Sequence, residues 1–576
     1  MAKIPFGQYM PDVLDLGSQV TRNLRNVIPR ADGYGPIKDI SAFTQALAGV
    51  CRGHFLARDP SSGEVVLFAG TATKLYKLDN STLAWSDVSL GAGSYSDLSS
   101  DAQWTFAQFN SVVVACQKNV APQEYTIGSS SAFANLAGSP PQAGWVAVIG
   151  PFLVLADLLS TPFRVQWSDV NDIIDWSAGS SDFQDMPGGG KVHAVGEWSY
   201  GVGLIAQGLN LRRMAFAPGS EEVFQIDKLR EDIGIIAPYS LVMAGGMAFF
   251  LSSKGFAQMG ADGALEHIGE ERVDRSFLGL HETNAPAELL SLAYDSSQTQ
   301  LVMGAASPKR NLYIVVYKST SGNSGQFDRG FVYHWTLKRW SPLTVSGEHI
   351  ARSARPGTTL EALDAIAPGA QTISATANNG SGLIRVTVGS TAAWTTGDYK
   401  TITGVAGTTE ANGSWVITVV NGTTIDLQGS AYANAYVSGG VVGGSVDELP
   451  FSLDDVSTAS FADTSAFNTS HKLGFFAGDT LEARLETAEA SIEGRRTLIN
   501  GVRPITDAAT VYAMSITRKN LNEAATEGTE SVMDEDGYCP LLDEGRYARF
   551  RTRIPAATVW NHAAGVEGDG MRAGRF

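Results

Sequence analysis

From about residue 64 to residue 345 the chain repeats one short pattern: a run of alternating or apolar residues, a brief turn, and a second such run. β-Branched and aromatic residues in the runs suit a pleated, half-buried surface, and glycines in the turns supply positive φ. Clear examples are Val65–Ala69 with Lys74–Leu78, Trp104–Phe109 with Val112–Cys116, Trp145–Ile149 with Phe152–Ala156, and Leu241–Ala244 with Met247–Leu251. The pattern predicts a succession of β-hairpins and an all-β chain, with amphipathic helices nearly absent.

Two of these segments resemble each other closely. Tyr76 to Ser86 and Tyr333 to Ser341 each have an aromatic-led strand, a polar turn, and a Trp-Ser pair that opens the next strand. A recurring aromatic landmark among many short hairpins is typical of radially repeated sheets, as in a β-propeller, and a large sandwich is the alternative. The repeat is too degenerate to give the number of blades. With 576 residues the chain exceeds the size of one core, about 250–300 residues, and we expect several domains.

A shift in composition marks a separate module. Between Pro368 and Val446 only five of 79 residues are charged, against 18% in the whole chain. Strand-like runs at Leu383–Val388, Ser414–Val420 and Thr424–Leu427 are separated by turn signals. We expect a small Ig-like β-sandwich inserted into the main fold. A flexible linker fits less well, because β-branched residues and two tryptophans can build a core.

Two features of the C-terminal part leave alternatives open. In Leu481–Ile492 the apolar residues fit one face of a helix and also a strand of period two, and propensity alone favours the helix. Farther on, arginines at 546, 549, 551 and 553 form the most basic patch of the chain. Positions 549, 551 and 553 share one face of a strand, and we expect that face to form ion pairs with carboxylates, with DNA contact as the alternative.

Focused chemistry is not evident in the sequence. Pro187–Lys191 lacks the spacing and the hydroxyl residue of a phosphate loop, and Asp534–Gly537 lacks the first and last ligands of a calcium loop. The pairs Asp169 with Asp172 and Glu221 with Glu222 suit solvated loops, and the eight histidines show no metal-binding spacing. Cys51, Cys116 and Cys539 lie far apart and indicate buried or reduced thiols. We therefore predict no catalytic, cofactor-binding or metal-binding residues, no cofactor, and no enzyme activity.

Net charge and hydropathy indicate whether the protein binds DNA over a broad surface or inserts into a membrane. The net charge of −17 makes a basic, DNA-gripping surface unfavourable for the chain as a whole. The N-terminal residues show no signal peptide, and the longest apolar run, Gly144 to Leu159, is too interrupted to span a bilayer. We expect no stable membrane insertion.

Several short segments, taken in order, resemble the tail nozzle family of short-tailed bacteriophages, also described as packaged-DNA stabilisation or tail hub proteins. The similar segments near the N-terminus are Gln8–Asp12, Asn26–Pro29 and Asp32–Tyr34; those in the middle are Trp85–Ser89, Trp104–Phe109, Phe163–Ser168 with Asp175-Trp176, Ile233–Ser240 and Phe249–Phe256; those near the C-terminus are Gly545–Tyr547, Ile554-Pro555, Trp560 and Ala564-Gly565. Each segment alone is weakly specific. Together they cover most of the chain outside 356–447.

The resemblance implies a β-propeller beside a β-rich platform, with Leu481–Ile492 as a strand. The expected domains are an N-terminal platform segment (1–47), a propeller (48–355), the inserted sandwich (356–447) and a C-terminal segment that completes platform and propeller (448–576). The implied function is a structural virion protein, assembled in the host cytoplasm, that forms the DNA exit channel and retains the packaged genome until ejection. Its partners would be further copies in a ring, commonly a hexamer, the portal and adaptor proteins, tail fibres or a tail needle, and double-stranded DNA in the lumen.

Two rival functions remain open at this point. A receptor-binding or fibre-anchoring tail protein would use exposed propeller and sandwich faces for recognition. A propeller-based glycan depolymerase would need a convergent acidic cleft with perturbed pKa values. If the nozzle interpretation holds, we expect a channel wall that is neutral or acidic, because clustered cations would bind DNA tightly and stop it from sliding.

Overall fold

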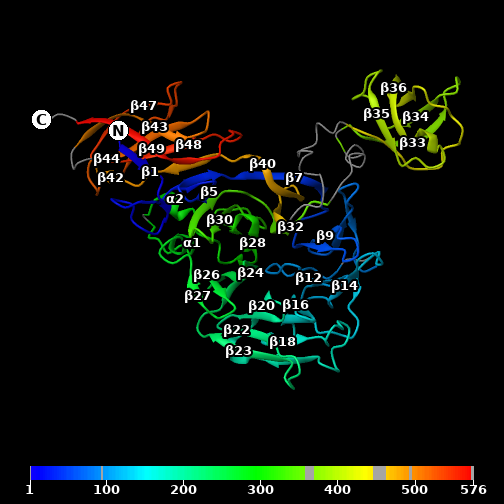
Figure 1. The fold of residues 1–576 in the computed structure, drawn as a ribbon, viewed down its shortest axis with the longest axis horizontal. Coiled ribbons are helices and arrows are strands. Elements are labelled where there is room, and N and C mark those ends of the chain that lie inside the picture. Colours follow the sequence, from blue (N-terminus) through cyan, green and yellow to red (C-terminus); the bar gives the residue numbers. More distant parts are fainter. Residues whose placement is uncertain are drawn as a thin grey trace.

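The computed structural model describes residues 2–91, 95–283, 285–356, 367, 369–444, 462–491 and 496–572. Its three parts are a propeller, a platform of two sheets packed against one side of the propeller, and a small barrel that stands apart from both (Figure 1). Nearly all of the regular structure is β, as the sequence predicts. The short helices are α1 (Asp274–Phe277), α2 (Ala287–Leu290), η1 (Pro187–Gly189), η2 (Thr299–Leu301), η3 (Pro308–Arg310) and η4 (Thr409–Ala411).

In the part of the chain that the structure describes, the propeller has seven four-stranded antiparallel blades, a number that the sequence did not provide. Six blades are continuous in sequence. Blade 1 is β8 (His54–Arg58), β9 (Val65–Gly70), β10 (Leu75–Leu78) and β11 (Trp85–Asp87); blade 2 is β12 (Thr105–Phe109), β13 (Val112–Cys116), β14 (Gln123–Thr126) and β15 (Ala134–Asn135); blade 3 is β16 (Ala143–Ile149), β17 (Phe152–Leu158), β18 (Arg164–Trp167) and β19 (Asp182–Asp185). Blade 4 is β20 (Val192–Ser199), β21 (Val202–Gln207), β22 (Leu211–Phe216) and β23 (Phe224–Arg230); blade 5 is β24 (Ile235–Ala244), β25 (Met247–Ser252), β26 (Gly255–Gly260) and β27 (Leu265–His267); blade 6 is β28 (Met303–Ser307), β29 (Leu312–Tyr317), β30 (Arg329–His334) and β31 (Arg339–Leu343).

The seventh blade closes the ring with strands from three distant segments. Its order is β32 (His349–Ser353), β39 (Asp463–Phe467), β40 (Lys472–Thr480) and β7 (Lys38–Ala46). The innermost strand of each blade contacts that of the next, and β32 contacts β8 of blade 1. The propeller therefore takes strands from the segments 1–47, 48–355 and 448–576, and closure fixes the two ends of the ring to each other.

All four hairpins predicted from the sequence are confirmed. The pairs β9–β10, β12–β13, β16–β17 and β24–β25 are antiparallel neighbours within their blades. Gly245 and Gly246 join the last pair with φ of +59° and +75°, which only glycine adopts without strain at both positions. The two similar segments occupy equivalent places: Tyr76 and Tyr333 lie on third strands, and Trp85 and Trp340 lie on the outer strands beside them.

The platform is built from both ends of the chain. One sheet contains β47 (Cys539–Gly545), β43 (Thr497–Thr506), β49 (Ala563–Arg572), β6 (Gly33–Pro36) and β5 (Val27–Arg30), with β1 (Ala2–Pro5) beside β49. The other contains β4 (Leu24–Arg25), β41 (Ala483–Glu486), β48 (Tyr547–Ile554), β44 (Tyr512–Arg518) and β45 (Thr526–Glu527), with β42 (Ala490–Ser491) beside β48 and β46 (Ser531–Val532) beside β44. A separate parallel pair joins β2 (Gln8–Tyr9) and β3 (Val20–Thr21). Strands β41 and β42 confirm an extended conformation over the described part of 481–492, against the helical propensity.

Platform and propeller share one hydrophobic core. Leu485 and Val566 of the platform belong to the same buried cluster as Phe256 and Phe331 of blades 5 and 6. Hydrogen bonds reinforce the contact, since the Ser341 hydroxyl donates to the Val27 carbonyl (2.6 Å). The platform is therefore an extension of the propeller body.

The inserted module is a closed six-stranded barrel, and the expected Ig-like sandwich is not what the structure shows. The order around the barrel is β33 (Gln371–Asn378), β34 (Ile384–Val388), β37 (Thr424–Leu427), β36 (Gly413–Asn421), β35 (Tyr399–Thr403) and β38 (Val441–Val442). The long strands β33 and β36 each pair with a neighbour on both sides, which joins the two halves into one closed sheet. Closure leaves no sheet edge, which a sandwich would expose.

Candidate functional site

The arginine-rich strand predicted near the C-terminus is β48, the central strand of the second platform sheet. Alternation along β48 places Ala548, Phe550 and Ile554 in the shared core. Arg549, Arg551 and Arg553 lie on the opposite face, as the period of two predicts. This arginine face is the largest arrangement of charge that the sequence singled out.

Carboxylates from neighbouring segments neutralise the arginine face. The ion pairs are Arg549 with Glu486 (3.3 Å) and Asp15 (3.9 Å), Arg551 with Glu486 (2.5 Å) and Glu527 (2.8 Å), and Arg553 with Glu530 (2.6 Å) and Glu482 (3.6 Å). The hydrogen bond from Arg553 lowers the pKa of Glu530. The sequence-based expectation of ion pairing is confirmed within the chain.

The fourth arginine of the basic patch lies apart from this face. The guanidinium of Arg546 lies over the ring of Tyr547, 5.9 Å from its centroid. The three strand arginines are committed to carboxylates, so the patch offers little free positive charge to a phosphate backbone. The ion pairs of the arginine face therefore favour a role in stabilising the platform sheet over a role in binding DNA.

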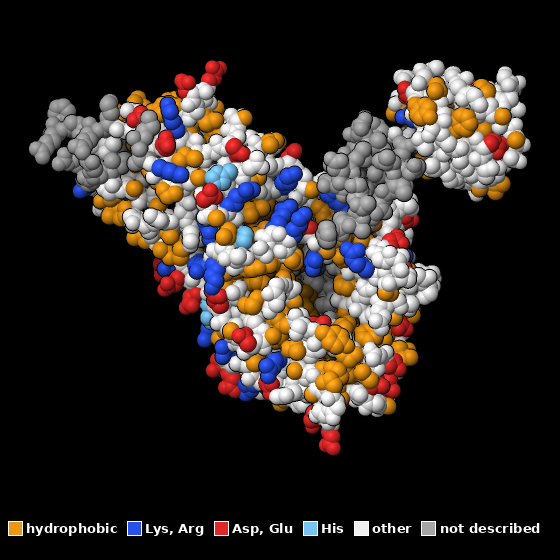
Figure 2. Space-filling view, viewed as in Figure 1, with side chains coloured by type: hydrophobic (Ala, Val, Ile, Leu, Met, Phe, Trp, Pro, Cys, Tyr) orange, Lys and Arg blue, Asp and Glu red, His pale blue; other side chains and the backbone are white. Residues whose placement is uncertain are grey.

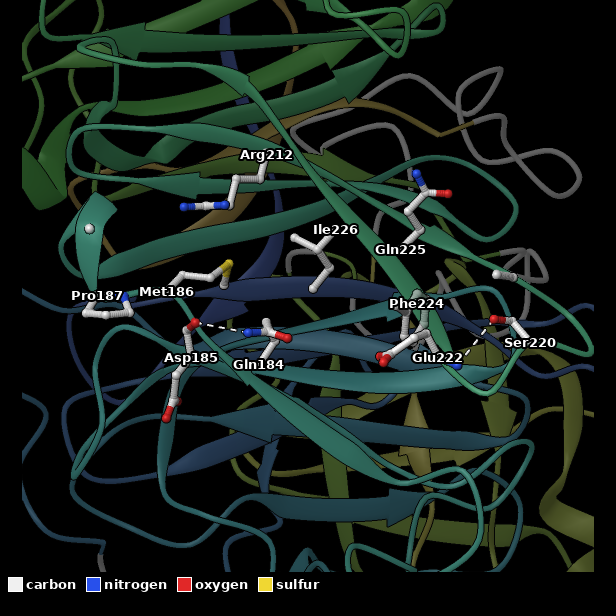
Figure 3. A pocket seen from close by; sticks show the side chains of 12 residues that line it. Gln184, Asp185, Met186, Pro187, Arg212, Ser220, Glu222, Phe224, Gln225 and Ile226 are labelled. Carbon is white, nitrogen blue, oxygen red and sulfur yellow. Dashed lines mark hydrogen bonds between the residues drawn. The ribbon is translucent and has the colours of Figure 1, made fainter.

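A groove of about 630 Å³ lies between the outer strands of blades 3 and 4. In Figure 3 Gln184, Asp185 and Met186 lie near one end, close to Pro187, while Phe224, Gln225 and Ile226 follow β23 across the view. Asp185 is bound by Arg164 through two hydrogen bonds of 2.6 and 2.9 Å, which lowers the pKa of the carboxyl. The groove thus presents a carboxylate already neutralised by a guanidinium.

The glycine run beside this groove does not form a phosphate cradle. Pro187–Gly189 is the short helix η1, and the Lys191 ammonium pairs with Asp157 at 3.0 Å. Asp157 also pairs with Lys118 at 2.6 Å. The lysine that a phosphate loop would direct at its ligand is therefore held by a carboxylate of blade 3.

Three of the acidic candidates accept backbone N–H groups in turns. Asp534 accepts the backbone N–H groups of Asp536 and Tyr538, and these bonds shape the turn at Asp534–Gly537, which lacks the ligands of a calcium loop. Asp169 accepts the N–H of Ser180, and Asp172 accepts that of Ile174. Glu221 and Glu222 lie on an exposed turn at the rim of the groove. The carboxylates of Asp534, Asp169 and Asp172 therefore serve local backbone geometry.

The structure brings together one cluster of possible metal ligands that was not predicted from the sequence. Cys51, Cys116 and Cys539 are all buried and free, but Cys51 lies beside two histidines, His54 and His349. The two histidines are 295 positions apart in sequence and meet only because blade 7 closes against blade 1. Among the residues that the structure describes, this is the one group of His, Cys, Asp and Glu side chains with a geometry suited to a metal ion. The Cys51-x-x-His54 spacing is visible in the sequence, but no spacing rule connects His349 to it.

No helix in the described part of the chain combines the length and apolar character needed to cross a membrane.

Comparison with known proteins adds little beyond the fold. No protein-family model matches the chain, and no curated protein matches it. Solved structures with a similar fold include the WD40 repeats of RRP9 (12% identity, 62% of this chain and 92% of that chain, TM-score 0.34) and U3-55K (12% identity, 68% and 100%, TM-score 0.35). The WD40 β-propeller domain of Doa1 is a third (10% identity, 55% and 89%, TM-score 0.31). The strands and blades described above are what make the chain an all-β protein with a β-propeller.

Proposed function

We propose that this chain is a structural subunit of the tail of a short-tailed bacteriophage, where a ring of copies forms the nozzle or hub below the portal and adaptor. The ring continues the DNA exit channel and retains the packaged genome until ejection. Its other partners are tail fibres or a tail needle, and the protein is assembled in the host cytoplasm into the virion.

One observation carries the proposal: some of the segments that resemble the nozzle family, drawn from the N-terminal, middle and C-terminal blocks, meet in one core although they are far apart in sequence. Trp560, from the C-terminal block, is buried in the shared core, where Tyr34 of the N-terminal block and Phe256 of the middle block also lie. Residues that are scattered through the sequence and packed together in space form one structural unit. This unit joins the propeller to the platform, as the resemblance implies.

Charge on the platform supports a sliding channel. The arginine face is neutralised within the chain, and the whole chain carries −17. A wall of this kind releases few counterions from DNA and therefore binds it weakly. Retention of the genome then depends on a constriction or on a partner that plugs the channel.

Copy number in purified particles tests the proposal. Quantitative mass spectrometry, scaled to the portal protein, should find a complete ring of this chain, with six copies expected. Cryo-electron microscopy of the same particles should place the chain directly below the portal and adaptor. A particle with one or two copies, or with the chain at the tips of fibres, would contradict it.

A receptor-binding role is the second candidate, because the barrel presents apolar side chains to solvent. Tyr399 is 69% exposed and Val437 is 72% exposed. Isolated protein added to host cells separates the two functions. Saturable binding that is lost when the barrel is removed would favour receptor recognition over the nozzle.

A further inference from the structure

The seam of the propeller, where β32 of blade 7 meets β8 of blade 1, holds a thiol and two imidazoles in its interior. Cys51 precedes β8, and His54 and His349 are the first residues of β8 and β32. One ligand atom from each of the three lies within 4.8 Å of the others. The exposed fractions are 0% for Cys51, 5% for His54 and 8% for His349. The cluster is therefore in the interior of the ring.

We propose that Cys51, His54 and His349 form a Zn²⁺ site that pins the first blade to the closing blade. A thiolate with two imidazoles is a ligand set that Zn²⁺ favours, with three protein ligands and a fourth position for water. This site is independent of the function proposed above.

Local backbone geometry brings the thiol and the first imidazole together. Gly53, between them, has a φ of +143°, and a Cβ at this position would lie 2.7 Å from the carbonyl oxygen of Trp104. Only glycine fits this turn. The Cys51 thiol lies 3.4 Å from the Gly53 carbonyl oxygen, on the inner side of the turn.

Hydrogen bonding already orients His54 as a metal ligand. The Ser465 hydroxyl donates its single proton to the Ala351 carbonyl (3.1 Å), so it accepts from Nε2 of His54 (3.0 Å). This arrangement puts the proton of His54 on Nε2 and leaves a lone pair on Nδ1. Metal-binding histidines are typically held in this way by a second hydrogen bond.

The two Nδ1 atoms face each other across the seam. They are 2.9 Å apart, with the proton of His349 between them. Zn–N bonds of about 2.0–2.1 Å at a tetrahedral angle would place the nitrogens roughly 3.3 Å apart, so the rings need to separate by only a few tenths of an ångström.

Binding has a defined proton balance. The Sγ–H bond of Cys51 breaks, an Sγ–Zn bond forms, and one proton leaves to solvent. The proton of His349 moves from Nδ1 to Nε2, which frees its lone pair. Glu348 accepts the backbone N–H of Cys51 (2.9 Å), also contacts Nδ1 of His471 (2.5 Å), and thereby places a carboxylate beside the site.

An open groove gives access to the cluster. His54 lines a groove of about 530 Å³ together with residues of β32 such as Ala351 and Arg352. An ion can enter by this route, and a water can occupy the fourth position.

Cobalt substitution tests the site in the full-length protein under reducing conditions. After treatment with a chelator, titration with Co²⁺ should give one bound ion per chain, with a thiolate-to-cobalt charge-transfer band that Zn²⁺ abolishes by displacement. Cys51→Ser should remove the band, and His349→Gln should weaken binding by roughly 100-fold. Ser465→Ala should weaken it by about tenfold through loss of orientation.

Cys116→Ser is the matched control, because Cys116 is equally buried but lies in β13 of blade 2. It should keep both the band and the affinity. A wild-type chain without the charge-transfer band overturns the proposal, as does equal loss of binding in Cys116→Ser. If Cys51→Ser fails to fold, the His349→Gln and Ser465→Ala titrations decide the question.

Discussion

The platform and the inserted barrel are both additions to the propeller, but they are attached in opposite ways. Platform residues lie in one core with blades 5 and 6, whereas the core of the barrel contains only residues between Ile373 and Val442. In Figure 1 the barrel stands clear of the body, and Figure 2 shows few charged side chains on its surface. The difference teaches that two β-rich segments of one chain can be either part of the main cooperative unit or independent of it. Shared burial decides which.

The largest effect is expected from a cavity in the shared core, which should destabilise the propeller and the platform together and leave the barrel unchanged. Trp340 is 1% exposed, and its indole N–H donates to the Ile268 carbonyl at 2.8 Å. Trp340→Ala should lower the free energy of unfolding of propeller and platform together by about 3–5 kcal/mol. Ile417→Ala in the barrel should destabilise the barrel alone, by about 2–5 kcal/mol. Calorimetry checks both; a barrel transition that moves with Trp340→Ala would show that the two cores are coupled.

Ion pairs extend the contrast. The side chain of Arg551 is 10% exposed and pairs with the buried Glu486, while Arg385 of the barrel is 34% exposed and pairs with Asp426. Arg551→Met should cost about 3 kcal/mol, because a buried carboxylate loses a partner. Arg385→Met should cost at most about 1 kcal/mol. Chemical denaturation of the two variants gives the values, and equal losses would contradict the assignment of a buried network to the platform.

The pH dependence of stability should have opposite signs for a buried carboxyl of the shared core and for a paired carboxyl of the barrel. Burial raises the pKa of Asp274, beside the shared core, to about 7. The folded protein therefore loses stability as pH rises from about 4 to 7, because the carboxyl ionises at lower pH in the unfolded chain than in the folded one. The free energy of unfolding of the Asp274→Asn variant should therefore equal that of the wild type near pH 4. At pH 8 it should be higher than that of the wild type by about 1–3 kcal/mol.

Asp426→Asn in the barrel should do the reverse. The hydrogen bond from Arg385 lowers the pKa of Asp426, so this carboxyl stabilises the barrel above about pH 4 and loses its effect as pH falls. The barrel variant should be less stable than the wild type at pH 8. Stability curves against pH for both variants test the signs, and parallel curves would refute them.

The smallest effect is expected from excision of the barrel. Gln371 pairs with Val442, so the first and last strands of the barrel lie side by side and both ends of the insertion leave from one place. Replacing residues 368–446 with a short Gly-Ser linker should change the main unfolding transition by less than about 0.6 kcal/mol, the cost of doubling a loop. Loss of the main transition in the shortened chain would show that the barrel belongs to the principal core.

Local patterns in the sequence determined the elements of this protein. Apolar runs such as Val112–Cys116 and turns such as Gly245-Gly246 specify hairpins, because strand-forming residues and positive φ act over a few residues. The same reasoning placed Arg549, Arg551 and Arg553 on one face and marked residues 368–446 as a separate module. The number of blades did not follow, because each blade repeats only loosely.

Tertiary structure alone decided how those elements close on one another. Strand β7 completes blade 7 beside β40, more than four hundred residues away along the chain, through backbone pairs such as Phe475 with Ser41. The barrel closes because β33 and β36 each pair on both sides, and the pattern of residues along a strand does not reveal its partners. The cluster of Cys51, His54 and His349 depends on that ring closure, because His349 lies 295 positions from His54 along the chain and only packing brings the two together.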